Sequence, residues 1–225
     1  MSSDVPVRLA VFDCDGTLVD GQAPVCDAME AAFGAAGIAP PSRQSIRQIV
    51  GLSLPHAVRH LAPSLAESKV AAIVESYKTS FREARERGEV AEPLFAGIAE
   101  LVERLRAEGW SLAVATGKSR RGLEHCLRTH GLTDSFDSLQ TADGHPSKPD
   151  PTMLRTAMEE TLAEPENTVM IGDTLYDMEM ACAADVRALG VSWGYHDTAT
   201  LLDAGASDIA DDAGQLYRLI CGAAK

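Results

Sequence analysis

The sequence is poor in aromatic residues, in basic residues and in extended apolar stretches. Aromatic side chains make up 5% of its 225 residues, and 20 Lys and Arg stand against 33 Asp and Glu, which gives a formal net charge of −13. This acidity disfavours nucleic acid and anionic membranes as partners, because both would repel the chain. No apolar run approaches the length of about 18 residues that a membrane helix needs, and no secretory leader pattern opens the sequence.

Cysteine is also sparse and shows no pairing pattern. The five cysteines are widely spaced and include no Cys-x-x-Cys pair, so we expect free thiols and a cytoplasmic protein. None of them has an arginine six residues later, which excludes the Cys-x5-Arg loop of cysteine phosphatases. The remaining composition, 45% hydrophobic and 24% charged, is typical of a soluble globular chain with room for one α/β core and a modest insertion.

Four short apolar runs, each followed at once by polar residues, are typical of buried strands that end in a turn. They occupy residues 8–12, 111–115, 168–171 and 187–191. Helical patterns lie between them, including an apolar stripe over residues 98–105 and a segment at 120–130 that stops at Gly131. This alternation predicts an α/β fold with a doubly wound, mostly parallel, Rossmann-like sheet covered on both faces.

Residues 21–91 interrupt the alternation, because they contain no convincing strand. Two apolar stripes at helical spacing run through this stretch, one over residues 25–36 and one over residues 70–84. We therefore predict a helical domain at 21–91, inserted into a core domain made of residues 1–20 and 92–225. The mixed-charge run 82–89, REARERGE, is interpreted as a solvated helix end.

Four polar clusters occur at or near the predicted carboxyl ends of strands, where open parallel sheets place their ligands. Taken singly, they read as a turn, a helix start, a surface lysine and a helix cap. Their combination in this order is improbable as an accident and favours a catalytic site. The clusters are Asp13-Cys14-Asp15-Gly16-Thr17, Thr116-Gly117-Lys118-Ser119, Ser147-Lys148-Pro149-Asp150-Pro151 and Gly172-Asp173-Thr174-Leu175-Tyr176-Asp177.

The residue types in these clusters suit phosphoryl chemistry. Asp13 and Asp15 could converge on one divalent cation, or act as nucleophile and as general acid and base. Thr116 and nearby backbone N–H groups could hold a phosphoryl oxygen, and Lys148 could supply a fixed positive charge. The GKS segment at 117–119 looks like the end of a Walker A loop, but Leu112 stands where that loop requires glycine, which excludes a nucleotide P-loop.

Together, VFDCDGTLVD, VATGKS, SKPDP and MIGDTLYD resemble the four motifs of the haloacid dehalogenase superfamily of aspartate-nucleophile phosphohydrolases. The helical insertion resembles its type I cap, and VSWGYH and GASDIADD further resemble the phosphoglycolate phosphatase-like branch. The resemblance implies an aspartyl-phosphate on Asp13 and proton transfer by Asp15. It also implies phosphoryl binding by Thr116 and Gly117, and orientation and charge neutralisation by Lys148.

The same resemblance implies a Mg²⁺ site. Its ligands would be Asp13, the backbone carbonyl of Asp15 and Asp173, with Asp177 in support. An oxygen-only set of this kind suits Mg²⁺, which keeps several of its waters. The implied activity is Mg²⁺-dependent hydrolysis of a small phosphorylated metabolite, and phosphoglycolate is the natural candidate.

Asp15 favours phosphate esters as substrates, since dehalogenases and phosphonatases of this fold lack an aspartate at that position. Two alternatives to a phosphatase stay open at this point. Val25 stands where β-phosphoglucomutase-like members carry histidine, so a phosphomutase is the less favoured activity. A phospho-acceptor signalling module is the non-enzymatic alternative, although it would need neither the insertion nor Asp15.

Substrate choice is expected to belong to the cap. Two candidates, Arg47 and the 51–53 loop with its Ser53, are hypothesised to lie over the leaving group when the cap closes. His56 and His60 are expected to be ordinary cap residues, because their HAVRH segment lacks the glutamate of a HExxH zinc motif. The sequence leaves the role of His145, the substrate and the oligomeric state open.

Overall fold

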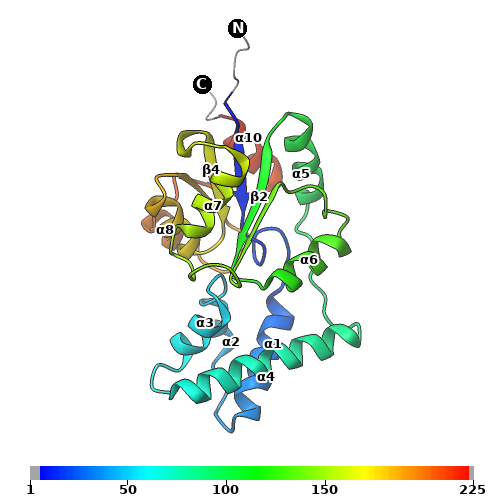
Figure 1. Cartoon of the computed structure of the whole chain (residues 1–225), viewed down its shortest axis with the longest axis vertical. Coiled ribbons are helices and arrows are strands. Elements are labelled where there is room, and N and C mark those ends of the chain that lie inside the picture. Colours follow the sequence, from blue (N-terminus) through cyan, green and yellow to red (C-terminus); the bar gives the residue numbers. More distant parts are fainter. Residues whose placement is uncertain (1–5, 223–225) are drawn as a thin grey trace.

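The computed structural model describes residues 6–222, and within them one six-stranded sheet forms the centre of the molecule (Figure 1). The strand order is β3-β2-β1-β4-β5-β6, and each neighbouring pair is parallel. This arrangement confirms the predicted doubly wound sheet. The strands are β1 (Leu9–Phe12), β2 (Ser111–Thr116), β3 (Ser138–Thr141), β4 (Thr168–Gly172), β5 (Arg187–Val191) and β6 (Asp208–Ala210).

Alternate side chains of the strands pack into two separate layers. From β1, Ala10 and Phe12 enter one apolar cluster and Leu9 and Val11 enter the other. The first cluster is covered by α5 (Ile98–Ala107), α6 (Arg120–Thr129) and α10 (Ala213–Gly222), and the second by α7 (Thr152–Thr161), α8 (Leu175–Ala183) and α9 (Thr198–Asp203). In Figure 1, α7 and α8 lie to the left of the strands and α5 and α6 to the right. A short 3-10 turn, Pro165–Asn167, leads into β4.

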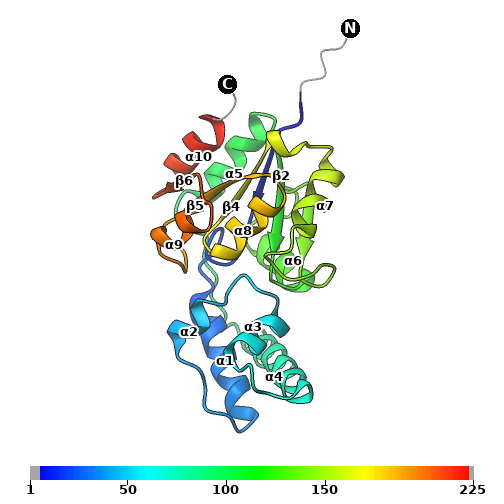
Figure 2. The ribbon, with the colours of Figure 1, turned by 90° about the vertical axis from the view of Figure 1, so that its left-hand side faces the viewer.

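Four helices between β1 and α5 form a second packed unit. They are α1 (Gln22–Ala35), α2 (Arg43–Arg47), α3 (Leu54–Leu61) and α4 (Glu67–Glu86), and they bury their own apolar cluster around Phe33 and Ile73. In Figures 1 and 2 this unit lies below the carboxyl ends of β1 and β2. The two connecting segments lie side by side, since the Asp20 N–H donates to the Pro93 carbonyl at 2.8 Å.

All five cysteines are free thiols, as expected. No helix within residues 6–222 is both long enough and apolar enough to cross a membrane.

Candidate active site

The parallel register brings three strand ends to one place. Phe12 pairs with Val114 of β2 and with Ile171 of β4, and the Asp13 N–H donates to the Ile171 carbonyl at 2.9 Å. Strands β1 to β3 are added in one direction and β4 to β6 in the other, so the strand order reverses between β1 and β4. Open α/β sheets bind ligands at such a switch point. Asp13 and Asp173 therefore flank the position where this fold places a ligand.

Three buried carboxylates meet at that position. Asp13, Asp173 and Asp177 each have an oxygen within 4.8 Å of the other two, and all three side chains are inaccessible to solvent. Asp173 is held in place by the Thr17 hydroxyl, which donates to Oδ1 at 2.9 Å, and by the Tyr195 N–H, which donates to Oδ2 at 2.9 Å. Burial, together with the charges of Asp13 and Asp177, raises the pKa of Asp173 well above its usual value.

Lys148 is the positive charge inside this cluster. Its Nζ lies 2.9 Å from Asp13 Oδ1 and 2.6 Å from Asp177 Oδ1, and the side chain is buried. Burial alone would lower the pKa of Lys148, but the two carboxylates outweigh it and raise that pKa. Burial raises the pKa of Asp13 to about 6 although Lys148 opposes the shift. One lysine thus leaves the three carboxylates with an excess of negative charge.

This cluster fits a divalent cation. Both carboxylate oxygens of Asp13 are buried and lack a hydrogen-bond partner among the described residues, and the Lys148 contact at Oδ1 is an ion pair without hydrogen-bond geometry. Asp177 is already occupied, because its Oδ2 accepts the Thr174 N–H at 3.1 Å and the Thr174 hydroxyl at 2.7 Å. Asp13 accepts no hydrogen bond within the described residues and Asp173 accepts one on each oxygen, whereas Asp177 accepts three, including one from Lys148. Asp13 and Asp173 are therefore the ligand candidates, and Asp177 orients Lys148. An all-oxygen, net negative site of this kind suits Mg²⁺.

Glycine is required where the first motif approaches the fourth. Gly16 has a φ of +91°, and a Cβ at this position would lie 2.1 Å from Asp173 Oδ2. Any side chain there would strain the backbone and push Asp173 out of the cluster. The close approach explains why the paired aspartates are followed by glycine.

Asp15 is held in a second charged group that the sequence did not reveal. Lys118 Nζ lies 2.8 and 2.9 Å from the two Asp15 oxygens and 2.8 Å from Glu92 Oε1. Burial would lower the pKa of Lys118, but Asp15 and Glu92 outweigh it and raise that pKa well above its usual value. Lys118 thus ties Asp15, at the end of β1, to Glu92 in the segment that returns from α4 to the core.

Thr116 and Gly117 lie beside the aspartates at the end of β2. Thr116 is buried, lines the same cleft as Asp13 and Asp15, and accepts the Lys118 N–H on Oγ1 at 3.2 Å. The backbone of Gly117 is packed against the 51–53 loop of the helical unit, since a Cβ there would lie 2.6 Å from the Gly51 carbonyl oxygen. Both residues line the cleft together with Asp13.

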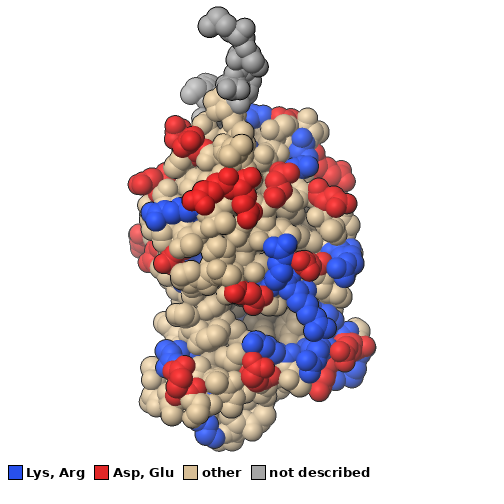
Figure 3. Space-filling view, viewed as in Figure 1, with Lys and Arg blue, Asp and Glu red and all other residues tan. Residues whose placement is uncertain are grey.

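A cleft of about 800 Å³ lies between the core and the helical unit, and Asp13 and Asp15 are among the residues that line it. Figure 3 shows the hollow at this boundary, with Lys and Arg side chains beside it. Ser53 lies in the lining and is buried, and its N–H donates to Ser147 Oγ at 2.9 Å. His145 also lines the cleft, with its Nε2 2.7 Å from Gln140 Oε1. Arg47 is exposed on α2 and is not part of the lining.

The interpretation of residues 82–89 as a solvated helix end is confirmed for most of the run, since α4 ends at Glu86 and residues 82, 83 and 86–89 are exposed, but Arg85 is partly buried. Arg82, Arg85 and Glu86 line the cleft, and the Arg85 side chain is only 20% exposed. Local sequence contains no sign that this face of α4 is turned toward α6.

Known proteins share both the sequence pattern and the fold. The family model "Haloacid dehalogenase-like hydrolase" matches residues 10–191. The chain is 36% identical over 206 residues to "Probable phosphatase IndB" of Dickeya dadantii, covering 90% of this chain and 89% of that protein. It is 31% identical over 194 residues to the phosphoglycolate phosphatase of Agrobacterium fabrum, covering 84% of this chain and 82% of that protein.

A solved structure agrees with these matches. The crystal structure of a predicted phosphatase from Clostridium acetobutylicum has a TM-score of 0.86 and 25% identity, and the match covers 97% of this chain and 100% of that one. The predicted enzyme class, a phosphatase, is confirmed. The chain belongs to the haloacid dehalogenase-like hydrolase family.

Proposed function

We propose that this protein hydrolyses a small phosphomonoester, with Mg²⁺ as cofactor, through an aspartyl-phosphate on Asp13. The observation that carries the proposal is the Asp13 carboxylate itself, which is buried below the cleft, contacts Lys148 and has no hydrogen-bond partner within the described residues. The first candidate for the substrate is phosphoglycolate, because one relative is named a phosphoglycolate phosphatase.

The reaction needs two displacements at phosphorus. In the first, an Asp13 oxygen attacks phosphorus, the bond between phosphorus and the ester oxygen breaks, and Asp15 gives a proton to the leaving oxygen. In the second, Asp15 takes a proton from water, the water oxygen attacks phosphorus, and the acyl-phosphate bond to Asp13 breaks to release phosphate. Each displacement returns the two aspartates to the state that the next one requires.

The remaining residues bind the phosphoryl group and offset its charge. Thr116 Oγ1 and the Gly117 N–H are proposed to bind its oxygens, and Lys148 offsets charge on the group and on Asp13. Mg²⁺, held by Asp13, the Asp15 carbonyl and Asp173, would supply further positive charge at the phosphoryl oxygens. Such compensation matters for an anionic substrate in a chain of net charge −13.

We assign residues 21–91 the role of a cap that selects the substrate. Its Gly51 carbonyl is packed on Gly117, and the Ser53 N–H is bonded to Ser147, so the 51–53 loop already lies over the phosphoryl-binding residues. This position supports Ser53 as a specificity residue. It gives Arg47 no comparable support, because Arg47 lies outside the cleft lining.

The proposal is tested by phosphate release from a panel of phosphomonoesters, measured with Mg²⁺ and after chelation of the metal. We expect release to continue past one equivalent per chain, to require the metal, and to fall by at least about 1000-fold in Asp13→Asn, which removes the nucleophile. Trapping a labelled phosphoryl group on wild-type protein but not on the variant would identify the intermediate.

Two results would contradict the proposal. Release that stops at one equivalent would favour the phospho-acceptor role. Transfer of phosphate between positions of a phosphorylated sugar, without net release, would favour the phosphomutase.

A further inference from the structure

Two helices present basic faces to the cleft from opposite sides. On α4, Lys78, Arg82 and Arg85 follow one another at intervals of four and three residues, so they lie on one face of the helix. On α6, Arg121, His125 and Arg128 have the same spacing. All six residues line the cleft, α4 from the cap side and α6 from the core side.

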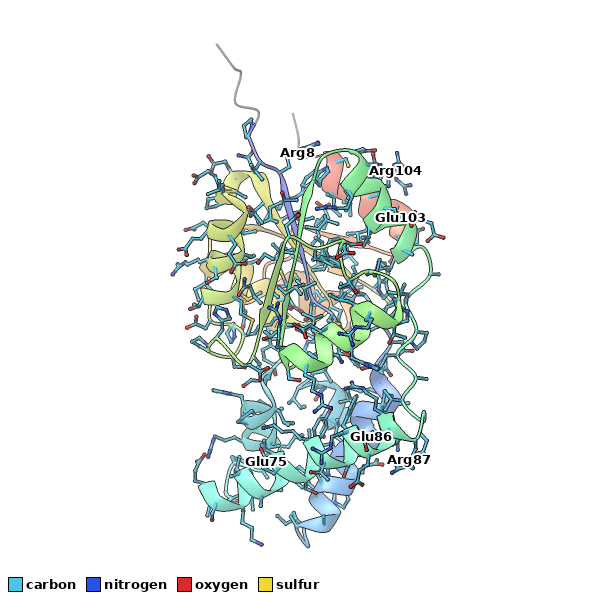
Figure 4. All side chains as sticks on the ribbon, turned by 45° about the vertical axis from the view of Figure 1, so that its right-hand side comes forward. Arg8, Glu75, Glu86, Arg87, Glu103 and Arg104 are labelled. Atoms are coloured by element: carbon cyan, nitrogen blue, oxygen red, sulfur yellow. The ribbon has the colours of Figure 1, made fainter. Side chains whose placement is uncertain are left out.

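Acidic residues neutralise only part of this group. Glu75 is paired with Lys78 at 2.8 Å, and Glu92 lies 3.9 Å from Arg85. Glu124 is paired with Arg120, which is outside this group, at 2.7 Å. Within residues 6–222, Arg82, Arg121 and Arg128 have no ion-pair partner. Figure 4 labels Glu75 and Glu86 on α4, which both line the cleft. Lys78, Arg82 and Arg85 lie between these two acids in the sequence.

Arg85 and His125 show that the positive charge reaches into the cleft. The Arg85 side chain is 20% exposed, and its Nε is buried with no hydrogen-bond partner among the described residues. A buried donor of this kind costs free energy until an acceptor reaches it. Burial, together with Arg85, Arg128 and Arg121, lowers the pKa of His125 despite the opposing charge of Glu92. Arginines from both helices therefore act on the same side chain.

The basic group extends away from the phosphoryl site. Ser119, the N-cap of α6, comes three residues after Thr116, so α6 starts beside the aspartates. Arg121 and Arg128 are seven residues apart on this helix, which corresponds to about 10 Å along its axis. A cleft of about 800 Å³ is large for a two-carbon phosphate ester, whose second charge would stay next to the aspartates.

We propose that this basic wall, defined as Lys78, Arg82 and Arg85 of α4 with Arg121 and Arg128 of α6, binds a second anionic group of the substrate. The substrate class is then a phosphomonoester whose leaving group carries a carboxylate or a further phosphate several bonds from the phosphorus that is attacked. This inference rests on the proposed phosphatase activity. It explains why an acidic chain concentrates unpaired arginines on both sides of one cleft.

The test compares three substrates that differ at one end only. Each is a hexyl phosphate whose far end carries a hydroxyl, a carboxylate or a second phosphate. For wild-type protein we expect kcat/KM at least about 10-fold higher with either anionic end than with the hydroxyl end, mainly through a lower KM. This preference should shrink as the salt concentration is raised, because Arg82, Arg121 and Arg128 are exposed and salt screens exposed charges.

The variants assign the preference to residues. In Arg82→Gln/Arg121→Gln/Arg128→Gln we expect the preference to fall to about 2-fold or less, while the hydroxyl-ended ester keeps its wild-type kcat/KM within about 2-fold. Lys69→Gln is the matched control, since Lys69 is an exposed cation of α4 outside the cleft lining. It should keep the full preference.

The inference is overturned if wild-type protein does not distinguish the three ends, or if the triple variant keeps the preference. Direct binding of a hexane bisphosphonate, which cannot be hydrolysed, separates the two proposals. Absence of turnover with these three esters and with the whole phosphomonoester panel contradicts the proposed function, but binding of the bisphosphonate that the triple variant loses still supports the basic wall. Equal binding by wild-type and triple variant overturns it.

Discussion

At the scale of single residues, the contact of Lys118 with both Asp15 and Glu92 has two consequences. The three side chains are 9%, 11% and 6% exposed, so the two carboxylates are largely removed from water. Without the lysine, Asp15 would have no cationic partner among the described residues and Glu92 would keep only Arg85, at 3.9 Å. Breaking a buried ion pair costs about 3–5 kcal/mol. In Lys118→Met we therefore expect the free energy of unfolding to fall by about 3 kcal/mol, measured by denaturant titration.

The same variant tests whether Lys118 positions Asp15 for proton transfer. An alkyl phosphate needs a proton on its leaving oxygen, whereas an aryl phosphate leaves easily without one. We expect Lys118→Met to lower kcat by at least about 10-fold on the alkyl ester and by much less on the aryl ester. Equal losses on both esters would contradict the positioning role.

Glu92→Gln in the Lys118→Met background separates stability from activity. The double variant has one buried carboxylate fewer, so it should recover part of the lost stability. It should not recover kcat on the alkyl ester, because Asp15 still lacks its cationic partner. Recovery of both would mean that Lys118 acts on stability alone.

Lys118 also shows where prediction from sequence stopped. Asp13, Asp15 and Asp173 could be placed because each comes soon after a strand, and parallel strand ends meet at one edge of a sheet. Asp177 could be placed because it lies about one helical turn beyond Asp173. Glu92, the second partner of Lys118, could not be placed from the sequence, because it lies in a connecting segment with no periodic pattern. The one available signal was the position of this lysine two residues after Thr116, at a strand end that the other motifs already marked.

At the scale of elements, helix caps give a matched pair of changes. Ser119 caps α6, where its hydroxyl accepts the Gly122 N–H at 3.2 Å, whereas the N-cap of α4 is Ala66, which is extended and offers no side-chain acceptor. Losing a cap costs about 1 kcal/mol, so Ser119→Ala should lower Tm by about 3 °C. Ala66→Ser should raise it by a similar or smaller amount. Thermal unfolding followed by circular dichroism checks both, and a shift of the same sign in the two variants would contradict the capping argument.

The strands explain why most of the fold, but not all of it, followed from the sequence. β1, β2, β4 and β5 were predicted because each is largely buried on both faces and reads as an apolar run. The strands β3 and β6 were missed. They lie at the two edges of the sheet, and their sequences SLQT and DIA are short and partly polar. An edge strand has one neighbour, so its sequence carries less of the signal that identifies a strand.

At the scale of the whole molecule, the buried carboxylates couple folding to pH and to metal. Burial raises the pKa of Asp13 to about 6, against 3.8 for the unperturbed side chain, and raises that of Asp173 as well. Between about pH 4 and pH 6 the folded state thus binds more protons than the unfolded state. These groups therefore make the metal-free protein less stable as pH rises through that window, by up to about 3 kcal/mol for a shift of two pKa units at Asp13.

The comparison of wild-type protein with Asp13→Asn isolates this effect from all other titrating groups. Without metal, we expect Asp13→Asn to be more stable than wild type at pH 7 and the difference to shrink toward pH 4, because Asp13 is protonated there. Mg²⁺ at pH 7 should raise the Tm of wild type far more than that of the variant, since a ligand stabilises only the state that binds it. Thermal melts from pH 4 to pH 7, with and without Mg²⁺, measure both differences. Parallel pH profiles for the two proteins would mean that Asp13 is uncharged or already neutralised at pH 7 without the metal, and the case for a cation at this carboxylate cluster would fail.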